Sequence, residues 1–122
     1  MEYINITDID DKFLNVTENE IKQANSFIED TATQMGINLS SIKVPVTFTI
    51  RRIGVLFACY TCCLARVGTD PTTSFENGNR QDIYAQKLGF YKQELNQLVS
   101  RLTRADFVGQ KASGTTINLW RS

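Results

Sequence analysis

The stretch RQDIYAQKLGFYKQELNQLVSRLTR, residues 80–104, decides the fold class of this chain. Apolar side chains recur in it at steps of three and four residues, the spacing that places side chains along one face of an α-helix. These residues are Tyr84, Leu88, Tyr91, Leu95, Leu98 and Leu102. At about 1.5 Å per residue, one helix over the whole stretch would be about 37 Å long. The pattern therefore predicts one long C-terminal helix that packs along another helix.

An acidic segment with a helix-capping pattern lies near the start of the sequence. Thr7 is followed three residues later by Asp10, as in a capping box, and this predicts a short helix over residues 7–13. Asp8, Asp10 and Asp11 suggest part of a divalent-cation site, but the further ligands, the glycine and the terminal glutamate of an EF-hand loop are missing. We therefore interpret these acids as first-turn residues that the helix dipole stabilises, and we expect no metal ion.

A second capping pattern predicts a helix over residues 17–35. Thr17 is followed by Glu20, and Gly36 stands where helices often end in a left-handed residue. Between these ends, apolar residues follow helical spacing and predict one buried face. They are Ile21, Ala24, Phe27, Ile28, Ala32 and Met35.

The most apolar part of the chain predicts a third helix over residues 47–67, after Pro45 and before Gly68. Alternating β-branched residues over 44–50 also suit a strand, but the helical pattern continues through them toward Gly68. The uncharged run 53–65 is shorter than the roughly 20 residues that a membrane-spanning helix needs. We therefore expect a helix that is buried within the protein, and no membrane.

Together these segments predict an all-α fold, a small four-helix bundle-like domain over residues 1–108 with an extended C-terminal arm over residues 109–122. The arm begins as a flexible spacer and continues as an alternating stretch that either packs on the helices or adds a strand to a partner, which we favour. The predicted partner-binding residues are Thr115, Thr116, Ile117, Asn118, Leu119 and Trp120. Phe75, in the long loop before the last helix, is a second candidate contact, unless its ring packs back onto the helices.

The charge balance excludes some partners. The chain carries 13 basic and 13 acidic side chains, so as a whole it has no general attraction for nucleic acid or for acidic membranes. Residues 1–43 nevertheless have a net charge of −5 and residues 44–122 a net charge of +5. Such halves neutralise each other within one molecule or pair head to tail between copies. The acidic first residues show no secretory signal, so we expect a protein made in the cytoplasm.

The sequence offers little for catalysis. It has no histidine, which removes the usual general base and the commonest zinc ligand, and it has no phosphate-loop or dinucleotide motif. We therefore expect neither an enzyme nor a bound cofactor. Cys59, Cys62 and Cys63 include a Cys-x-x-Cys spacing, but three sulfurs do not complete a zinc site, and we interpret them as small buried residues. Arg51 and Arg52 suit a phosphate contact, but we expect them to form ion pairs with a neighbour.

The predicted helices read, in order, YINITDIDDKF, TENEIKQANSFIEDTATQMG, VPVTFTIRRIGVLFACYTCCLARVG and DIYAQKLGFYKQELNQLVSRL, within about residues 3–108. This order resembles that of the head-to-tail connector, or adaptor, proteins of long-tailed bacteriophages. The resemblance implies a small helical bundle in the virion neck that assembles as a ring of about twelve copies beneath the portal. It further implies that the ring continues the DNA channel, that it binds a stopper or tail-side neck protein, and that the arm engages the portal or another neighbour.

Two other functions stay open. One is a small helical DNA-binding regulator, for which Arg101 and Arg104 are sparse and the neutral net charge is unfavourable. The other is a thiol-dependent enzyme that uses Cys59 or Cys62. In the connector interpretation, DNA only passes non-specifically through the channel, which requires no basic stripe.

Overall fold

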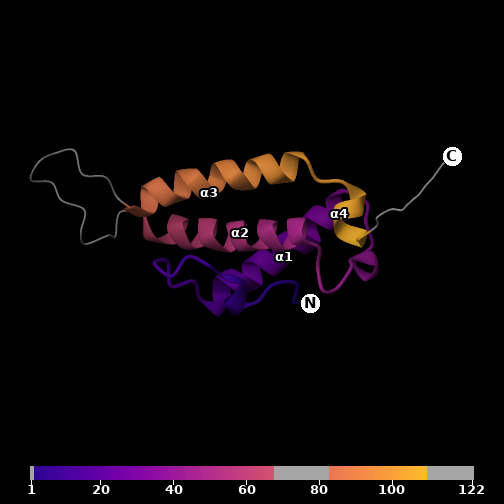
Figure 1. The fold of residues 1–122 in the computed structure, drawn as a ribbon, viewed down its shortest axis with the longest axis horizontal. Coiled ribbons are helices and arrows are strands. Elements are labelled where there is room, and N and C mark those ends of the chain that lie inside the picture. Colours follow the sequence, from indigo (N-terminus) through magenta and orange to yellow (C-terminus); the bar gives the residue numbers. More distant parts are fainter. Residues whose placement is uncertain (1, 68–82, 110–122) are drawn as a thin grey trace, which may run out of the picture.

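The computed structural model of the chain describes residues 2–67 and 83–109, and every regular element in these two ranges is a helix (Figure 1). Three are long α-helices, one is a short α-helix, and two are single turns of 3-10 helix. In chain order they are η1 (Ile6–Asp8), α1 (Glu18–Gln34), η2 (Leu39–Ser41), α2 (Phe48–Arg66), α3 (Ile83–Ser100) and α4 (Arg104–Val108). The predicted all-α class is confirmed for this part of the chain.

α2 is the central helix, with α1 packed on one side of it and α3 on the other (Figure 1). Toward α1, the α2 residues Ile50 and Ala58 join a cluster that contains Ile28. Toward α3, Leu56 of α2 joins a cluster that contains Leu95. Because two opposite faces of α2 are covered, the helix is apolar on most of its sides, as its sequence predicts.

The N-terminal segment, residues 2–17, and α1 both approach α2 closely at Gly54. A β-carbon at this position would lie 2.9 Å from Cγ2 of Ile4 and 3.1 Å from Cδ1 of Ile28. One buried amide then holds the segment onto α1. Oδ1 of Asn25 accepts hydrogen bonds from the backbone N–H groups of Tyr3 and Ile4, at 2.8 and 2.9 Å, and its Nδ2 donates to the Ile4 carbonyl at 3.3 Å. Tyr3 and Ile4 therefore pack against α1 and α2, although they precede η1 and belong to no helix.

Both predicted ends of the second helix are confirmed. Thr17 precedes α1, and its backbone N–H donates to the Glu20 carboxylate at 2.8 Å, which is the predicted capping box. At the other end, Gly36 has a φ of +78°. This left-handed turn lets the N–H of Ile37 donate to the carbonyl of Ala32 at 2.9 Å, which closes the last turn of the helix.

The predicted short helix over residues 7–13, capped by Thr7 and Asp10, is wrong. η1 is a single turn, and its capping pair is Asn5 and Asp8. The Asn5 side chain accepts from the N–H of Thr7 at 2.9 Å, and the Asp8 carboxylate accepts from the N–H of Asn5 at 2.9 Å. Asparagine caps a helix at least as well as threonine. Since Asn5 comes two residues earlier, the turn starts there and Thr7 lies inside it.

α2 agrees with the predicted third helix. Thr47 is its N-cap, with the hydroxyl accepting from the N–H of Ile50 at 3.4 Å, and the alternative strand over residues 44–50 does not form. Gly68, the predicted end, lies outside the described residues. By length and mean hydropathy alone, α2 also passes as a membrane-spanning helix, but half of that span is buried inside the structure, as is usual for a core helix.

The prediction of one helix over residues 80–104 is wrong at its C-terminal end. The apolar seam packs on α2 as predicted, and Leu95 is buried, but α3 ends at Ser100. Thr103 then starts α4, and its backbone N–H donates to the Asp106 carboxylate at 2.9 Å. This capping box begins a new helix. The continuous helical spacing of the apolar residues hides the break in the sequence.

α4 folds back against the chain that leads into α2. Phe107 is fully buried in the cluster shared with α1. Its carbonyl accepts from the N–H of Lys43 at 2.8 Å, and the Thr47 hydroxyl donates to the Asp106 carbonyl at 2.6 Å. The bundle therefore has three long helices and a short fourth one, and the single long C-terminal helix of the prediction is divided in two.

Candidate functional site

The contact residues that the sequence predicts lie outside the described part of the chain. They are Phe75 in the loop and, in the arm, Thr115, Thr116, Ile117, Asn118, Leu119 and Trp120. The structure therefore neither brings them together nor separates them. Four features of the described residues bear on function: a polar network, a cysteine cluster and two charged surfaces.

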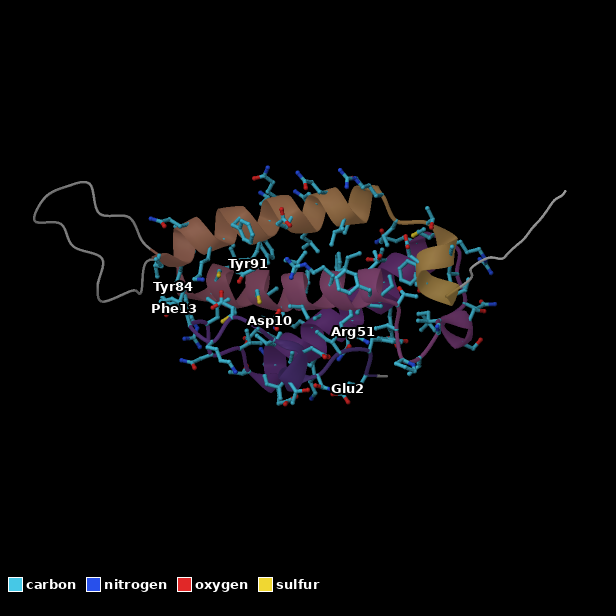
Figure 2. The ribbon with its side chains drawn as sticks, viewed as in Figure 1. Glu2, Asp10, Phe13, Arg51, Tyr84 and Tyr91 are labelled. Carbon is cyan, nitrogen blue, oxygen red and sulfur yellow. The ribbon has the colours of Figure 1, made fainter. Side chains whose placement is uncertain are left out.

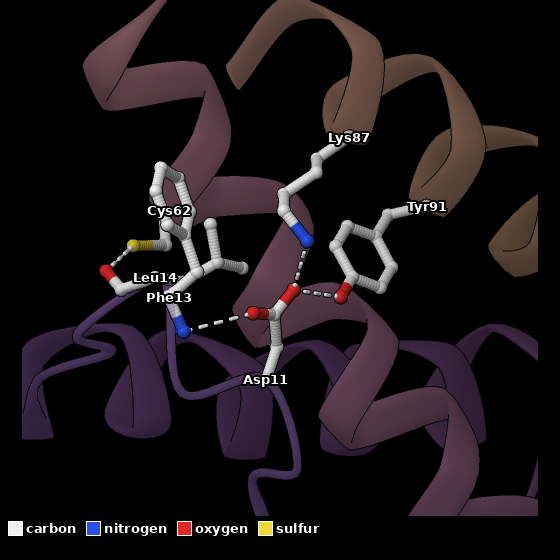
Figure 3. A network of polar contacts seen from close by, with 6 residues as sticks. All are labelled: Asp11, Phe13, Leu14, Cys62, Lys87 and Tyr91. Carbon is white, nitrogen blue, oxygen red and sulfur yellow. Dashed lines mark hydrogen bonds and ion pairs between the residues drawn. The ribbon is translucent and has the colours of Figure 1, made fainter. Parts of the chain in front are cut away.

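The polar network centres on Asp11, which joins the N-terminal segment to α3 (Figure 3). Oδ2 of Asp11 lies 2.8 Å from Nζ of Lys87 and accepts a hydrogen bond from the Tyr91 hydroxyl, while Oδ1 accepts from the N–H of Phe13 at 3.0 Å. Burial favours the neutral acid, but the hydrogen bonds from Lys87 and Tyr91 outweigh it, so the pKa of Asp11 is lowered. The same carboxylate, together with burial, raises the pKa of Tyr91. Asp11 is thus a structural link, and not the first-turn residue that the sequence suggested.

The three cysteines lie on the buried side of this network. Cys59, Cys62 and Cys63 form one cluster with Leu14 and with α3 side chains, and each is at most 1% exposed. Cys62 Sγ donates to the Leu14 carbonyl at 3.1 Å (Figure 3). Burial raises the pKa of Cys59 to about 12 and that of Cys63 to about 11, and it raises the pKa of Cys62 as well. Their predicted role as small buried residues is confirmed.

This environment does not favour the alternative of a thiol enzyme. A catalytic cysteine needs an accessible thiolate, which a lowered pKa supplies. Here burial acts in the opposite direction on all three thiols. Within residues 2–67 and 83–109, no group of three or more cysteine, aspartate or glutamate side chains is arranged to hold a metal ion. The cysteine cluster therefore reads as part of the core between α2, α3 and the N-terminal segment.

A basic and aromatic surface lies at the start of α2. It consists of Phe48, Arg51 and Arg52, which share one side of the helix at spacings of three and four residues; Arg51 is labelled in Figure 2. We call it the arginine surface. The Phe48 side chain is 76% exposed. A depression of about 390 Å³ beside it is also lined by Asp8 and Asp10.

Among the described residues, the two guanidinium groups do not make the ion pairs that the sequence predicts. Neither the Arg51 nor the Arg52 side chain forms an ion pair or a hydrogen bond with another described residue, although carboxylates line the same depression. Asp8 instead caps η1. Two cations and an exposed phenyl ring are therefore available at one place, a combination that is enriched at the centres of protein interfaces.

The second charged surface lies on α1 and is acidic. A depression of about 500 Å³ is lined by Glu2, Glu18 and Glu29, and also by Lys22 and Ile21. We call it the acidic hollow; Glu2 is labelled in Figure 2. Glu29 also accepts a hydrogen bond from the Tyr3 hydroxyl at 2.8 Å. Burial, followed by this contact, raises the pKa of Tyr3 to about 12.

The fold places most of the acidic residues and most of the basic residues of the described chain on different elements. Residues 2–34, which form the N-terminal segment and α1, contain eight acids and two lysines, a net charge of −6. Residues 35–67 contain four basic residues and no acid, and residues 83–109 have a net charge of +2. Because α1 and α3 lie on opposite sides of α2 (Figure 1), most of the acidic residues lie on the α1 side, and most of the basic residues lie on α2 and α3. The division is not complete, since Asp8 and Asp10 lie beside Arg51 and Arg52, and Asp11 pairs with Lys87.

Sequence reasoning missed three residues that matter here. Phe48 looked like a core position because it lies in an apolar run. Its exposure follows from its place at the first turn, on the side that neither α1 nor α3 covers. Asn25 interrupts the apolar face of α1, and that interruption was the available signal for a buried polar contact. Phe107 was missed because the predicted last helix ends at residue 104, and no element was predicted for the residues that follow.

Comparison of the whole chain with protein-family models, with curated proteins and with solved structures found no match.

Proposed function

We propose that this chain is a structural protein of the virion neck of a long-tailed bacteriophage. In this proposal, copies of the chain form a ring that joins the capsid portal to the tail or to the next neck protein and continues the DNA channel. The order of the helical elements, with the apolar helix at the centre, supports the proposal. The chain is made in the host cytoplasm and ends in the virion.

The observation that carries the proposal is the separation of charge around α2. A ring needs heterologous contacts, in which one surface of a subunit meets a different surface of the next. A subunit that carries most of its acidic residues on the α1 side and most of its basic residues on α2 and α3 offers such a pair of surfaces. Opposite charges favour this head-to-tail contact and disfavour contacts between like surfaces.

The proposed partners are sister copies, about twelve in the ring, the portal protein, and a stopper or tail-side neck protein. The arm residues Thr115–Trp120 are proposed to engage the portal or another neighbour through backbone pairing and apolar side chains. DNA passes through the channel without specific contacts. Because the portal serves as a template for the ring, the isolated chain is proposed to be monomeric or weakly associated.

The test is sedimentation of the purified chain with and without a candidate portal protein. The proposal expects co-sedimentation of many copies with the portal ring, and weak association without it. Absence of portal binding at every concentration tested would contradict the proposal. A variant that lacks residues 110–122 tests the arm separately, because binding that survives this deletion removes the arm from the contact.

Filter binding to duplex DNA at low salt separates this function from a DNA-binding regulator. A connector subunit retains little DNA, since non-specific affinity depends on basic side chains that contact phosphates. A regulator would retain one sequence well above others. Tight and sequence-selective retention would favour the regulator and would argue against the neck protein.

A further inference from the structure

We infer that the arginine surface of one copy, Phe48 with Arg51 and Arg52, docks onto the acidic hollow on α1 of a second copy. The inference rests on the self-association that the proposed function requires. It goes further by assigning the two surfaces that come into contact. It is carried by the exposure of Phe48, by two guanidinium groups that pair with no residue in the described ranges, and by the complementary charge of the hollow.

The arginine surface has the composition of an interface anchor. Aromatic residues and arginine dominate the binding energy of protein interfaces, because they bury a large area and make directional contacts with carboxylates. Phe48 is 76% exposed, whereas the apolar residues at the next turn of α2, such as Ile50 and Ile53, are 1% exposed. Thr47 holds this end of the helix in place through its hydrogen bonds to Ile50 and Asp106. The phenyl ring is therefore presented on a rigid element.

The acidic hollow fits this anchor in sign and in shape. Glu2, Glu18 and Glu29 place three carboxylates around a depression of about 500 Å³, and Ile21 contributes apolar lining. A phenyl ring can enter such a depression while the guanidinium groups beside it reach the rim. Lys22 also lines the hollow, and in the docked pair its ammonium group can face the Asp8 and Asp10 carboxylates that lie beside the arginine surface of the other copy.

The mixed charges favour a second copy over nucleic acid. Asp8 and Asp10 line the depression next to Arg51 and Arg52, and these carboxylates would repel a phosphate backbone. The acidic hollow presents carboxylates together with Lys22, so it matches both signs. Since the two surfaces differ, a docked pair of copies still has one free arginine surface and one free acidic hollow. The contact therefore propagates from copy to copy, and closes when the rotation between copies completes a circle.

Charge reversal with complementation tests the contact. The first variant carries Arg51→Glu and Arg52→Glu, and the second carries Glu2→Lys and Glu18→Lys. Self-association, measured by sedimentation over a concentration series, is expected to weaken at least about tenfold for each variant alone. An equimolar mixture is expected to recover association, because the unchanged arginine surface of the second variant meets the unchanged acidic hollow of the first, and the two reversed surfaces complement each other. Phe48→Ser is expected to weaken association to a similar extent.

The matched control reverses the same amount of charge elsewhere on the basic part of the molecule. Lys92→Glu with Arg101→Glu changes two exposed residues that line neither surface. This variant is expected to associate like the native chain. Because Phe48 and Arg51 are exposed, circular dichroism and thermal unfolding are expected to show the native fold for every variant. At a concentration at which the native chain associates, equal association of the Arg51→Glu, Arg52→Glu variant, or a mixture that fails to recover association, overturns the inference.

A photo-cross-linking amino acid in place of Phe48 detects the contact even where association is too weak for sedimentation. The cross-link is expected on a peptide of α1 or on the segment that contains Glu2, in a second copy. A cross-link elsewhere, or none in the isolated chain and none in the portal complex, overturns the inference. The proposed function and this inference fail on different results. Absence of portal binding contradicts the proposed function. If the native chain binds the portal and the Arg51→Glu, Arg52→Glu variant associates as well as the native chain, only the assigned surfaces are wrong.

Discussion

Nζ of Lys87 on α3 lies 2.8 Å from Oδ2 of Asp11, across 76 residues of sequence. The Tyr91 hydroxyl donates to the same oxygen, so one carboxylate holds α3 against the N-terminal segment (Figure 3). The Lys87 ammonium also lies 5.6 Å from the centre of the Phe13 ring. These contacts hold the N-terminal segment and α3 together next to the buried cysteine cluster.

Replacing Asp11 by asparagine is expected to destabilise the fold by about 2 kcal/mol, because hydrogen bonds to a charged group are worth more than neutral ones. The folded-state pKa of Asp11 is lowered. Its contribution is therefore fully present above the unfolded pKa of about 3.9 and is lost as the pH falls through the folded value. Urea unfolding at a series of pH values should show a smaller acid loss for Asp11→Asn than for the native chain. The exposed neighbour provides a control, since Asp10→Asn should leave both stability and acid loss nearly unchanged.

Replacing Asn25 by alanine is expected to cost about 3 kcal/mol. The substitution leaves the backbone N–H groups of Tyr3 and Ile4 buried without their acceptor, and a buried unsatisfied group is expensive. Thermal unfolding measures the loss, and hydrogen exchange at Ile4 should accelerate. Asn19→Ala, at an exposed position of α1, should leave stability almost the same. Equal effects of the two substitutions would show that the amide of Asn25 does not hold the segment.

Two helical glycines are expected to respond to alanine with opposite signs. At Gly54 a β-carbon would lie 2.9 Å from Ile4, so Gly54→Ala should destabilise the fold by about 1–3 kcal/mol through overpacking. At Gly89 of α3 a β-carbon would meet nothing within 4 Å. Gly89→Ala should therefore stabilise by about 0.5–1 kcal/mol, because alanine favours the helix. Chemical denaturation of the pair checks both signs.

The cysteines are expected to react slowly with thiol reagents while the protein is folded. Burial raises the pKa of all three, so little thiolate is present near neutral pH. Labelling at pH 8 should be at least about tenfold slower in buffer than in denaturant. Rapid labelling of one cysteine in the native protein would contradict this, and would revive the thiol-enzyme alternative.

Much of the fold is readable from the sequence because its signals are local. The capping box of Thr17 and Glu20, and the left-handed Gly36, lie next to the ends that they define. Helical periodicity identified α2 and the apolar seam of α3. Local signals fail where two of them compete: Asn5 and Thr7 both suit an N-cap, and the pair of Thr103 and Asp106 begins a helix inside a pattern that looked continuous.

The candidate surfaces were harder to predict, for a different reason. Charge counts along the chain showed an acidic and a basic part, but the side of α2 on which each part lies depends on tertiary packing. Whether a residue in an apolar run is buried also depends on which faces its neighbours cover. Phe48 and Ile50 have similar hydrophobicity and lie two residues apart, yet one is 76% and the other 1% exposed.

The docking of α4 determines the geometry of whatever the C-terminal residues reach. The N–H of Lys43 is bonded to the Phe107 carbonyl and the Thr47 hydroxyl to that of Asp106. The last described residue, Gly109, is thereby held beside the chain that leads into α2, where a β-carbon added to it would meet Cδ of Lys43. In the proposed function, a neighbour that binds next to Gly109 would therefore lie close to the start of α2, the end of the helix that carries Phe48.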